Sequence, residues 1–184
     1  MSATVRAMPA QKPGRSEQTV ETPWAFLDAV EARFGLITHD LAATETNCKC
    51  RHVLKPRCHR FGPGSPMGED ALSEDWTRLV GALWLNPPFG DVAPWAEKCK
   101  ASATHPPRLD TQRRICFLVP ASLDTRWFHE HVYGHARIFA LSGRLTFVGH
   151  ESPYVKSLIL AVYGEEPGFE TWDWRKQRTD VEGR

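Results

Sequence analysis

The turn Asn86-Pro87-Pro88-Phe89 holds the residues of this chain whose types and spacing best suit chemistry. The side-chain oxygen of Asn86 and the carbonyl of Pro87 can accept both N–H bonds of a planar aromatic amine, which moves charge onto the amine nitrogen. Pro87 restricts Asn86 to an extended conformation, and two successive prolines keep the turn stiff. Stiffness favours catalysis because acceptors act best when they are already in place. Phe89 adds a ring face for stacking, so the turn predicts activation of an amine such as N6 of adenine.

An amine of this kind is a weak nucleophile, because its lone pair is delocalised into the ring. In duplex DNA it is also buried in a base pair, so the base must be flipped out before it reacts. We expect a direct displacement in which the amine attacks the methyl group of a sulfonium donor. Asparagine is no general base at neutral pH, so the proton is expected to leave after methyl transfer, and no cysteine nucleophile is required.

The catalytic turn needs a strand before it and a helix after it, and the sequence predicts both. An apolar strand is predicted at 81–85 and a helix at 92–104, with other strands at 36–40, 113–120, 136–142 and 157–164, a helix at 122–133, a hairpin arm at 144–149 and a loop over 44–70. Alternating strands and helices predict an α/β fold with a mostly parallel sheet and helices on both faces. Ligands bind such sheets beyond the carboxyl ends of the strands, where the loops after Asp40 and at Asn86 both lie.

The first helix is predicted from its end signals and its apolar spacing. Thr22 is a suitable N-cap, and Pro23 suits the first helical position. Phe26 and Val30 recur at helical spacing, and Gly35 supplies the stop.

A length of 184 residues suits one domain with tails. We predict a disordered tail over 1–19, a domain over 20–165, and a polar tail over 166–184 that contains Trp172 and Trp174. The hydrophobic content of 41% and charged content of 24% are ordinary for a globular protein. No apolar stretch suits a membrane span or a signal peptide, so we expect a cytoplasmic protein with no membrane partner. Five cysteines are an odd number, and we expect them to be reduced thiols.

Several ordered blocks resemble the phage-type DNA N6-adenine methyltransferases, the Dam family. The resemblance runs from about Val20 to Gly164, over ETPWAFLDAVEARFG, HDLAATETNCKC, ALSEDW, ALWLNPPFGDVAPWAEKC, FLVPASLDTRWFHEHV, SGRLTF and SLILAVYG. It implies a Rossmann-like S-adenosylmethionine-dependent methyltransferase fold, with S-adenosyl-L-methionine as cofactor and double-stranded DNA as partner. It also implies site-specific methylation of adenine N6 in a bacterial or phage-infected cell, with the turn 86–89 as catalytic loop.

The same resemblance implies four cofactor-binding residues. By analogy with larger adenine methyltransferases of the gamma class, Thr22 and Pro23 would lie against the methionine carboxylate, because a helix N-terminus suits an anion. Asp40 would bind the methionine ammonium, and Asp70 would accept a hydrogen bond from the adenine amine of the cofactor. A Gly-rich loop, common in methyltransferase cofactor sites, does not follow Asp40, and no residue is assigned to the ribose hydroxyls.

A basic stretch from Lys49 to Arg60 is one candidate for contact with DNA. It carries Arg51, Lys55 and Arg57 and no acidic residue, and each cation that meets a phosphate releases counterions. A solvated loop that happens to be basic is the simpler explanation of the same stretch.

Three residues nearer the expected site are further candidates for contact with DNA. Arg126 could reach a phosphate, and Trp127 could line the pocket of the flipped base. Packing of Trp127 into the core is an equally good interpretation. Arg144 follows Gly143 on a turn, where it could reach DNA or simply be an exposed surface arginine.

We predict no metal site. Cys48, Cys50, Cys58 and His59 could in principle hold zinc, but their spacing fits no common zinc motif. Scattered thiols in a basic loop explain them better.

Two other functions are compatible with these residues. Similar turns serve other planar amines, such as cytosine N4, an RNA base or a protein glutamine amide. The missing Gly-rich loop also allows a DNA-binding module that keeps the fold without catalysis. The loops 48–68 and 143–156 are expected to carry any specificity for DNA sequence.

Overall fold

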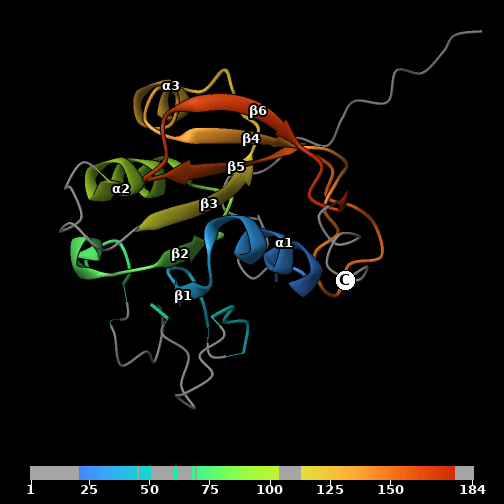
Figure 1. Ribbon diagram of the computed structural model, residues 1–184, viewed down its shortest axis with the longest axis horizontal. Helices are drawn as coiled ribbons and strands as arrows, with labels where there is room; N and C mark the ends of the chain where they lie inside the picture. The colour runs from blue at the N-terminus through green and yellow to red at the C-terminus, as the bar shows by residue number, and fades with distance from the viewer. Residues whose placement is uncertain are drawn as a thin grey trace, which may run out of the picture.

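A six-stranded mixed sheet in the order β1-β2-β3-β5-β4-β6 forms the centre of the computed structural model (Figure 1). The structure describes residues 21–44, 46–50, 60–61, 68, 70–103 and 113–176. The strands are β1 (Ile37–Asp40), β2 (Ala82–Leu85), β3 (Arg114–Pro120), β4 (Arg137–Leu141), β5 (Leu158–Tyr163) and β6 (Gly168–Trp172). The helices are α1 (Trp24–Phe34), α2 (Ala93–Ala103) and α3 (Arg126–His131), with a short 3-10 helix, η1 (Trp76–Arg78).

Strand β5 alone runs against the direction of the other strands. It pairs antiparallel with β3 and with β4, whereas β1 with β2, β2 with β3, and β4 with β6 pair parallel. The predicted α/β architecture with a mostly parallel sheet is therefore confirmed. Because β5 is reversed, the loop from β4 to β5 lies at the edge of the sheet where β1, β2 and β3 end.

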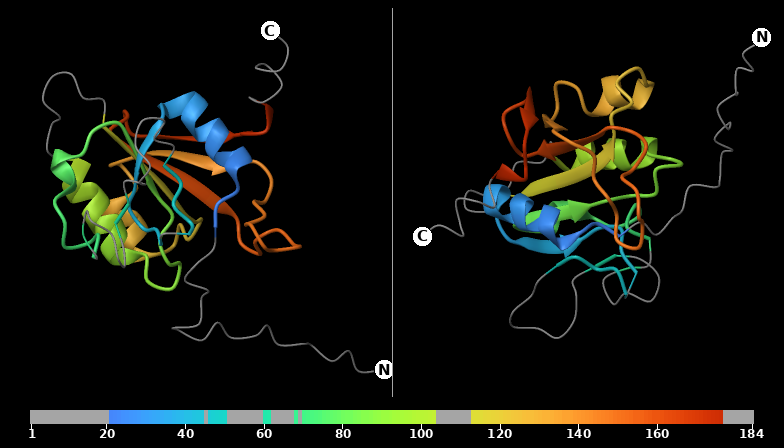
Figure 2. Two further views of the ribbon diagram at one scale, coloured as in Figure 1. Left: turned by 90° about the horizontal axis from the view of Figure 1, so that it is seen from below. Right: turned by 90° about the vertical axis from the view of Figure 1, so that its right-hand side faces the viewer.

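Helices cover both faces of the sheet, as the sequence predicts (Figure 2). On one face α1 packs through Phe26 in a cluster that includes Trp84. On the other face α2 and α3 pack through Cys99 and Phe128 in a cluster that includes Leu83. Successive side chains of a strand point to opposite faces, so a strand covered on both sides must be apolar throughout.

Helix α1 begins one residue later than predicted and ends where the sequence predicts. Pro23, with φ −68° and ψ 139°, is the N-cap, and no side chain caps the helix. The prediction of Thr22 as N-cap is therefore wrong, because the helix begins at Trp24. The predicted stop at Gly35 is confirmed, since this residue has a φ of 96° and its N–H donates to the carbonyl of Glu31.

Two further elements differ from the prediction by more than one residue at an end. Helix α3 spans Arg126–His131 rather than 122–133, with Thr125 as its N-cap. The predicted hairpin arm at 144–149 is not a strand, although Val148 forms an isolated antiparallel bridge with Glu21.

Part of the segment predicted as a polar C-terminal tail belongs to the sheet. Strand β6 pairs with β4 at the sheet edge, and Trp172 and Trp174 are buried in the same cluster as α1. Trp172 lies with its ring centroid 5.9 Å from those of Phe26 and Phe139. The alternation of polar and apolar residues in Gly168–Trp172 is too short to have predicted the strand. The tail predicted at 1–19 lies outside the described residues.

The cysteines only partly follow the prediction. Cys48 is disulfide-bonded, so the prediction of reduced thiols is wrong at this position. Cys99 and Cys116 are free and buried thiols, and burial raises the pKa of both, that of Cys116 to about 12.

None of the helices among the described residues has the length and apolar character that a membrane-spanning helix needs.

Candidate active site

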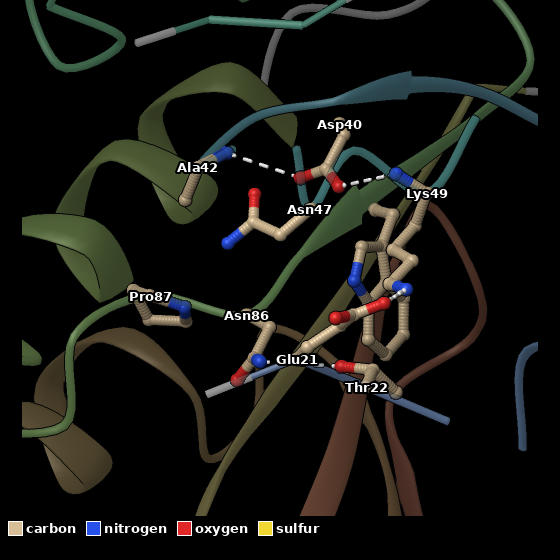
Figure 3. A pocket seen from close by; sticks show the side chains of 9 residues that line it. Glu21, Thr22, Asp40, Ala42, Asn47, Lys49, Asn86 and Pro87 are labelled. Carbon is tan, nitrogen blue, oxygen red and sulfur yellow. Dashed lines mark hydrogen bonds and ion pairs between the residues drawn. The ribbon is translucent and has the colours of Figure 1, made fainter. Parts of the chain in front are cut away.

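A pocket beyond the carboxyl ends of β1 and β2 brings together four residues that the sequence predicts for the site (Figure 3). These residues are Thr22, Asp40, Asn86 and Pro87. The other residues that line the pocket are Glu21, Ala42, Asn47, Lys49 and Trp84. Strands β1 and β2 pair in parallel with Asp40 opposite Trp84, which is why the loops that follow them meet.

Asn86 lies directly after β2, and its amide is joined to the start of α1. Its Nδ2 group donates a hydrogen bond of 3.2 Å to the hydroxyl oxygen of Thr22. Thr22 is only 1% exposed. Pro87 also lines the pocket, whereas neither Pro88 nor Phe89 does. Of the turn 86–89, the first two residues therefore line the pocket, and these are the ones that the sequence predicts to accept the amine protons.

Asp40 is buried at the end of β1, and its carboxylate organises the following loop. One oxygen accepts from the backbone N–H of Ala42 at 3.3 Å and the other from that of Lys49 at 2.9 Å. Burial raises the pKa of Asp40 to about 7, although these hydrogen bonds and the charges of Lys49 and Arg60 oppose the rise. The Asp40 carboxylate therefore joins the beginning of the following loop, at Ala42, to its end, at Lys49, and it also borders the pocket.

Lys49 and Glu21 form an ion pair on the pocket wall that sequence analysis missed. The Lys49 side chain is 3% exposed, and its Nζ also lies 4.7 Å from the ring centroid of Trp24. Glu21 and Lys49 are 28 residues apart in the sequence, so no local pattern reports the pair. Both were overlooked because a lysine within a basic stretch is usually solvated.

Asn47 closes a turn within the same loop. Its side-chain oxygen accepts a hydrogen bond of 2.7 Å from the backbone N–H of Thr44. Figure 3 shows the Asn47 side chain between the Asp40 and Asn86 sides of the pocket.

Phe89 packs against two rings of the loop between β4 and β5. Its centroid is 5.4 Å from that of Tyr154 and 6.1 Å from that of Phe147, and these two rings also contact each other. We call Phe89, Phe147 and Tyr154 the aromatic cluster. Burial raises the pKa of the Tyr154 hydroxyl. The ring predicted to stack on a base is thus held from the side by a loop that is distant in sequence.

Two predicted cofactor residues lie outside this pocket. The carbonyl of Pro23 accepts hydrogen bonds from the backbone N–H groups of Phe26 and Leu27. Asp70 is exposed and caps the turn before η1, because its carboxylate accepts from the N–H of Leu72 at 3.0 Å. Neither residue lines the pocket of Asp40 and Asn86.

The basic stretch is not a uniform exposed patch. Its two ends are buried, since Lys49 is 3% and Arg60 is 5% exposed. Arg60 also forms an isolated bridge with Asp40 and lies beside the same loop. The candidates Arg51, Lys55 and Arg57 lie outside the described residues.

The other predicted DNA contacts have different surroundings. Arg126 is highly exposed but pairs with Glu130 at 2.7 Å. Trp127 is partly buried and packs against the cluster under α3, as its alternative interpretation as a core residue predicts. Arg144 is exposed, and its carbonyl accepts a hydrogen bond of 2.9 Å from Arg175.

The cluster considered for zinc from the sequence lies only partly within the part of the chain that the structure describes. No group of three or more His, Cys, Asp or Glu side chains is arranged there to hold a metal ion. Cys58 and His59, two members of the cluster considered from the sequence, lie outside those residues.

The fold and the pocket together define an α/β protein with a polar pocket at the carboxyl edge of a mostly parallel sheet, the edge where such sheets bind ligands. Residues 10–157 match the family model described as DNA N-6-adenine-methyltransferase (Dam). This is most of the chain, and the protein therefore belongs to that family, which confirms the resemblance seen in its sequence. A similar protein is the DNA N-6-adenine-methyltransferase of Escherichia phage T1, with 26% identity over 147 residues, or 80% of this chain. The match covers 54% of the phage protein, so the chain spans about half the length of this relative.

Proposed function

We propose that this protein transfers a methyl group from S-adenosyl-L-methionine to N6 of adenine in double-stranded DNA, on a Rossmann-like methyltransferase fold. One observation carries the proposal: Asn86 and Pro87 line the same pocket as Asp40. An amine held at Asn86 and a cofactor held near Asp40 would therefore share one cavity. Membership of the Dam family and the mostly parallel sheet support the same activity and fold.

The charged groups of the pocket fit the methionine end of the cofactor. Carboxylates of Asp40 and Glu21 suit its ammonium and sulfonium charges, and the ammonium of Lys49 suits its carboxylate. Thr22 and Pro23 would complete this side at the start of α1, where backbone N–H groups favour an anion. When bound, S-adenosylmethionine supplies the methyl group. Asp70, exposed on the segment that leads into β2, is proposed for the adenine end.

The chain's own contribution to methyl transfer lies in the turn 86–89. The oxygens of Asn86 and Pro87 accept the two N–H bonds of the target amine and so raise its nucleophilicity. Pro88 keeps these acceptors in place, which lowers the reorganisation needed during reaction. Phe89, held by the aromatic cluster, stacks on the flipped base.

Exposed cations near this edge are proposed to hold the duplex. Arg126 and Arg144 are exposed, and phosphate contacts position a protein on DNA without reading its sequence. Arg51, Lys55 and Arg57 are retained as candidates from the sequence, and Trp127 as a candidate for the wall of the base pocket. A DNA substrate would place the enzyme in the cytoplasm of a bacterial or phage-infected cell.

The decisive experiment measures transfer of labelled methyl groups from S-adenosylmethionine to duplex DNA, with the product nucleosides identified by mass spectrometry. We expect N6-methyladenine. Asn86→Ala should reduce the rate about 100- to 1000-fold, as loss of one preorganised polar group does elsewhere. Asn86→Asp is the matched control, because it keeps a side-chain oxygen and should retain more activity than the alanine variant.

Two results would contradict this proposal. Methylation of cytosine, RNA or a glutamine peptide in place of adenine would move the enzyme to another amine substrate. Absence of both heat and a thermal shift with S-adenosylmethionine would favour a DNA-binding module without catalysis.

A further inference from the structure

The loop 142–157, between β4 and β5, leaves two apolar side chains exposed to solvent. Val148 is 47% and Val155 is 71% exposed, whereas Leu145 and Phe147 of the same loop are buried. Val155 is the most exposed large hydrophobic residue in the part of the chain that the structure describes. A single exposed apolar residue is ordinary on a protein surface, so the meaning of Val155 depends on where the loop holds it.

This loop is anchored beside the candidate active site, at the edge of the sheet where the pocket lies. The backbone N–H of Val148 donates a hydrogen bond of 2.9 Å to the carbonyl of Glu21, which lines the pocket. The ring of Tyr154 contacts Phe89 of the catalytic turn, with 5.4 Å between the two centroids. Val155 directly follows Tyr154 in the chain. An anchored backbone therefore holds the exposed side chain of Val155 close to the catalytic turn.

The surface around Val155 suits a polyanion. The next residue, Lys156, and Arg144 at the other end of the loop are both exposed, and Glu151 is the one acid of the loop. Contacts between such cations and phosphates position a protein on DNA. A duplex held in this way would bring its base stack against Val155.

We propose that Val155 is a wedge that enters the base stack of DNA when the target adenine is flipped into the pocket, and that it fills the space which the base leaves. This inference rests on the proposed function. Flipping costs the stacking and pairing of the base, and apolar side chains are the ones that proteins insert between stacked bases. Insertion moves Val155 out of water, which stabilises the flipped state.

Loss of the wedge should matter most where the base is difficult to extrude. On a duplex with one mapped methylation site, Val155→Ala should lower kcat/KM at least ~10-fold, since less of the unstacking cost is then offset. On the same duplex with the target adenine mismatched, the loss should be less than ~3-fold, because a mismatched base is flipped at lower cost. Val155→Leu should stay within ~3-fold of the wild type on both duplexes, because leucine is also an apolar wedge.

Val80→Ala is the matched control for Val155→Ala. Val80 is 48% exposed, and it precedes β2, so it lies at the opposite edge of the sheet from Asn86. Its substitution should leave kcat/KM unchanged on both duplexes. Neither valine is buried, so both variants should keep the urea midpoint of the wild type. A fall in activity of Val155→Ala is then not a result of unfolding.

A fluorescent base measures flipping without methyl transfer. 2-Aminopurine at the target position becomes brighter when it leaves the base stack. With saturating protein and S-adenosylhomocysteine, we expect this rise for the wild type and for Val80→Ala. Val155→Ala should give at most about half of the rise, because its flipped state is less populated.

Three results would overturn the inference and leave the proposed function standing. Equal losses on matched and mismatched duplexes would show that Val155 contributes to DNA binding alone. An undiminished 2-aminopurine signal with Val155→Ala would show that flipping does not need this side chain. A mismatch-dependent loss in Val148→Ala, with none in Val155→Ala, would assign the wedge to the other exposed valine. If the wild-type protein forms no N6-methyladenine in DNA, the proposed function fails, and the inference fails with it.

Discussion

The two halves of the sheet carry different kinds of side chain to the same edge. The half made by β1, β2 and β3 ends in polar groups. Asp40 is held there by hydrogen bonds from the backbone N–H groups of Ala42 and Lys49, and Asn86 by the hydrogen bond that its amide donates to Thr22. The half made by β5, β4 and β6 is stabilised by packed aromatic rings. Trp172 packs in the core, and the aromatic cluster packs the loop between β4 and β5 against the turn 86–89.

This difference follows from how each half is anchored. Hydrogen bonds fix single atoms, as activation of an amine and binding of a charged cofactor require. Ring contacts are less directional, and they stabilise a loop and a sheet edge by burying apolar area. We therefore expect substitutions in the polar half to change chemistry and cofactor affinity, and substitutions in the ring-packed half to change stability and the DNA side of the site.

The largest effect expected in the ring-packed half is on stability. Trp172→Ala should reduce the free energy of unfolding by about 3–5 kcal/mol, because it removes a large buried side chain and leaves a cavity. Urea denaturation measures this loss. Phe169→Ala on the same strand is the control, since Phe169 is 54% exposed and should change stability by less than ~0.5 kcal/mol. Equal effects of the two substitutions would contradict the assignment of β6 to the core.

In the polar half, the largest pH effect should involve Asp40. Its pKa is about 7, so if the cofactor's positive charges prefer the carboxylate, the Kd of S-adenosylmethionine should fall about tenfold from pH 6 to pH 8. Asp40→Asn should remove this dependence, which calorimetry across this pH range measures. A Kd that varies equally in both proteins would exclude Asp40 from cofactor binding.

The same ionisation predicts how stability depends on pH. A raised pKa in the folded state means that the Asp40 contribution is fully favourable below its unfolded pKa of 3.8 and is lost as pH rises through about 7. Asp40→Asn should flatten this part of the stability profile, which urea midpoints between these values measure. An unchanged profile would show that the carboxyl does not titrate in this range.

A smaller effect is expected where the halves meet. Tyr154→Ala removes two ring contacts from the aromatic cluster, each worth about 0.5–1.5 kcal/mol beyond its buried area. The KM for DNA should rise a few-fold, with the Kd of the cofactor unchanged. Tyr133→Ala, at an exposed tyrosine after α3 (63% exposed), is the control. A change in cofactor affinity rather than in KM for DNA would place Tyr154 on the polar side.

The smallest effect is expected for Arg126. Its guanidinium would have to leave the carboxylate of Glu130 in order to contact a phosphate of DNA. Arg126→Ala should reduce the slope of log Kd for DNA against log salt concentration by about 1. Arg78→Ala is the control, because Arg78 is equally exposed and is also paired with a nearby acid, Asp75. An unchanged slope for Arg126→Ala would remove this residue from the DNA interface.

The sequence alone was sufficient for the features that are encoded locally. Apolar runs predicted five of the six strands, because a strand covered on both faces must be apolar along its whole length. Pro87 and Pro88 stiffen the turn after β2 wherever that turn lies, and the ordered blocks predicted the family. Asp40 and Asn86 were expected at one edge because the carboxyl ends of parallel strands meet there.

Only the tertiary structure decided which distant side chains meet. Thr22 and Asn86 are 64 residues apart, and Lys49 and Glu21 are 28 apart, so no local pattern reports that they bond. A lysine in a basic stretch is expected to be exposed to solvent. Lys49 is buried instead, because Glu21, which is distant in sequence, pairs with it. The same holds for β6, whose polar residues suggested a tail. In the structure its Trp172 packs against Phe26 of α1 and Phe139 of β4. Packing between segments far apart in the chain, rather than local composition, determines these contacts.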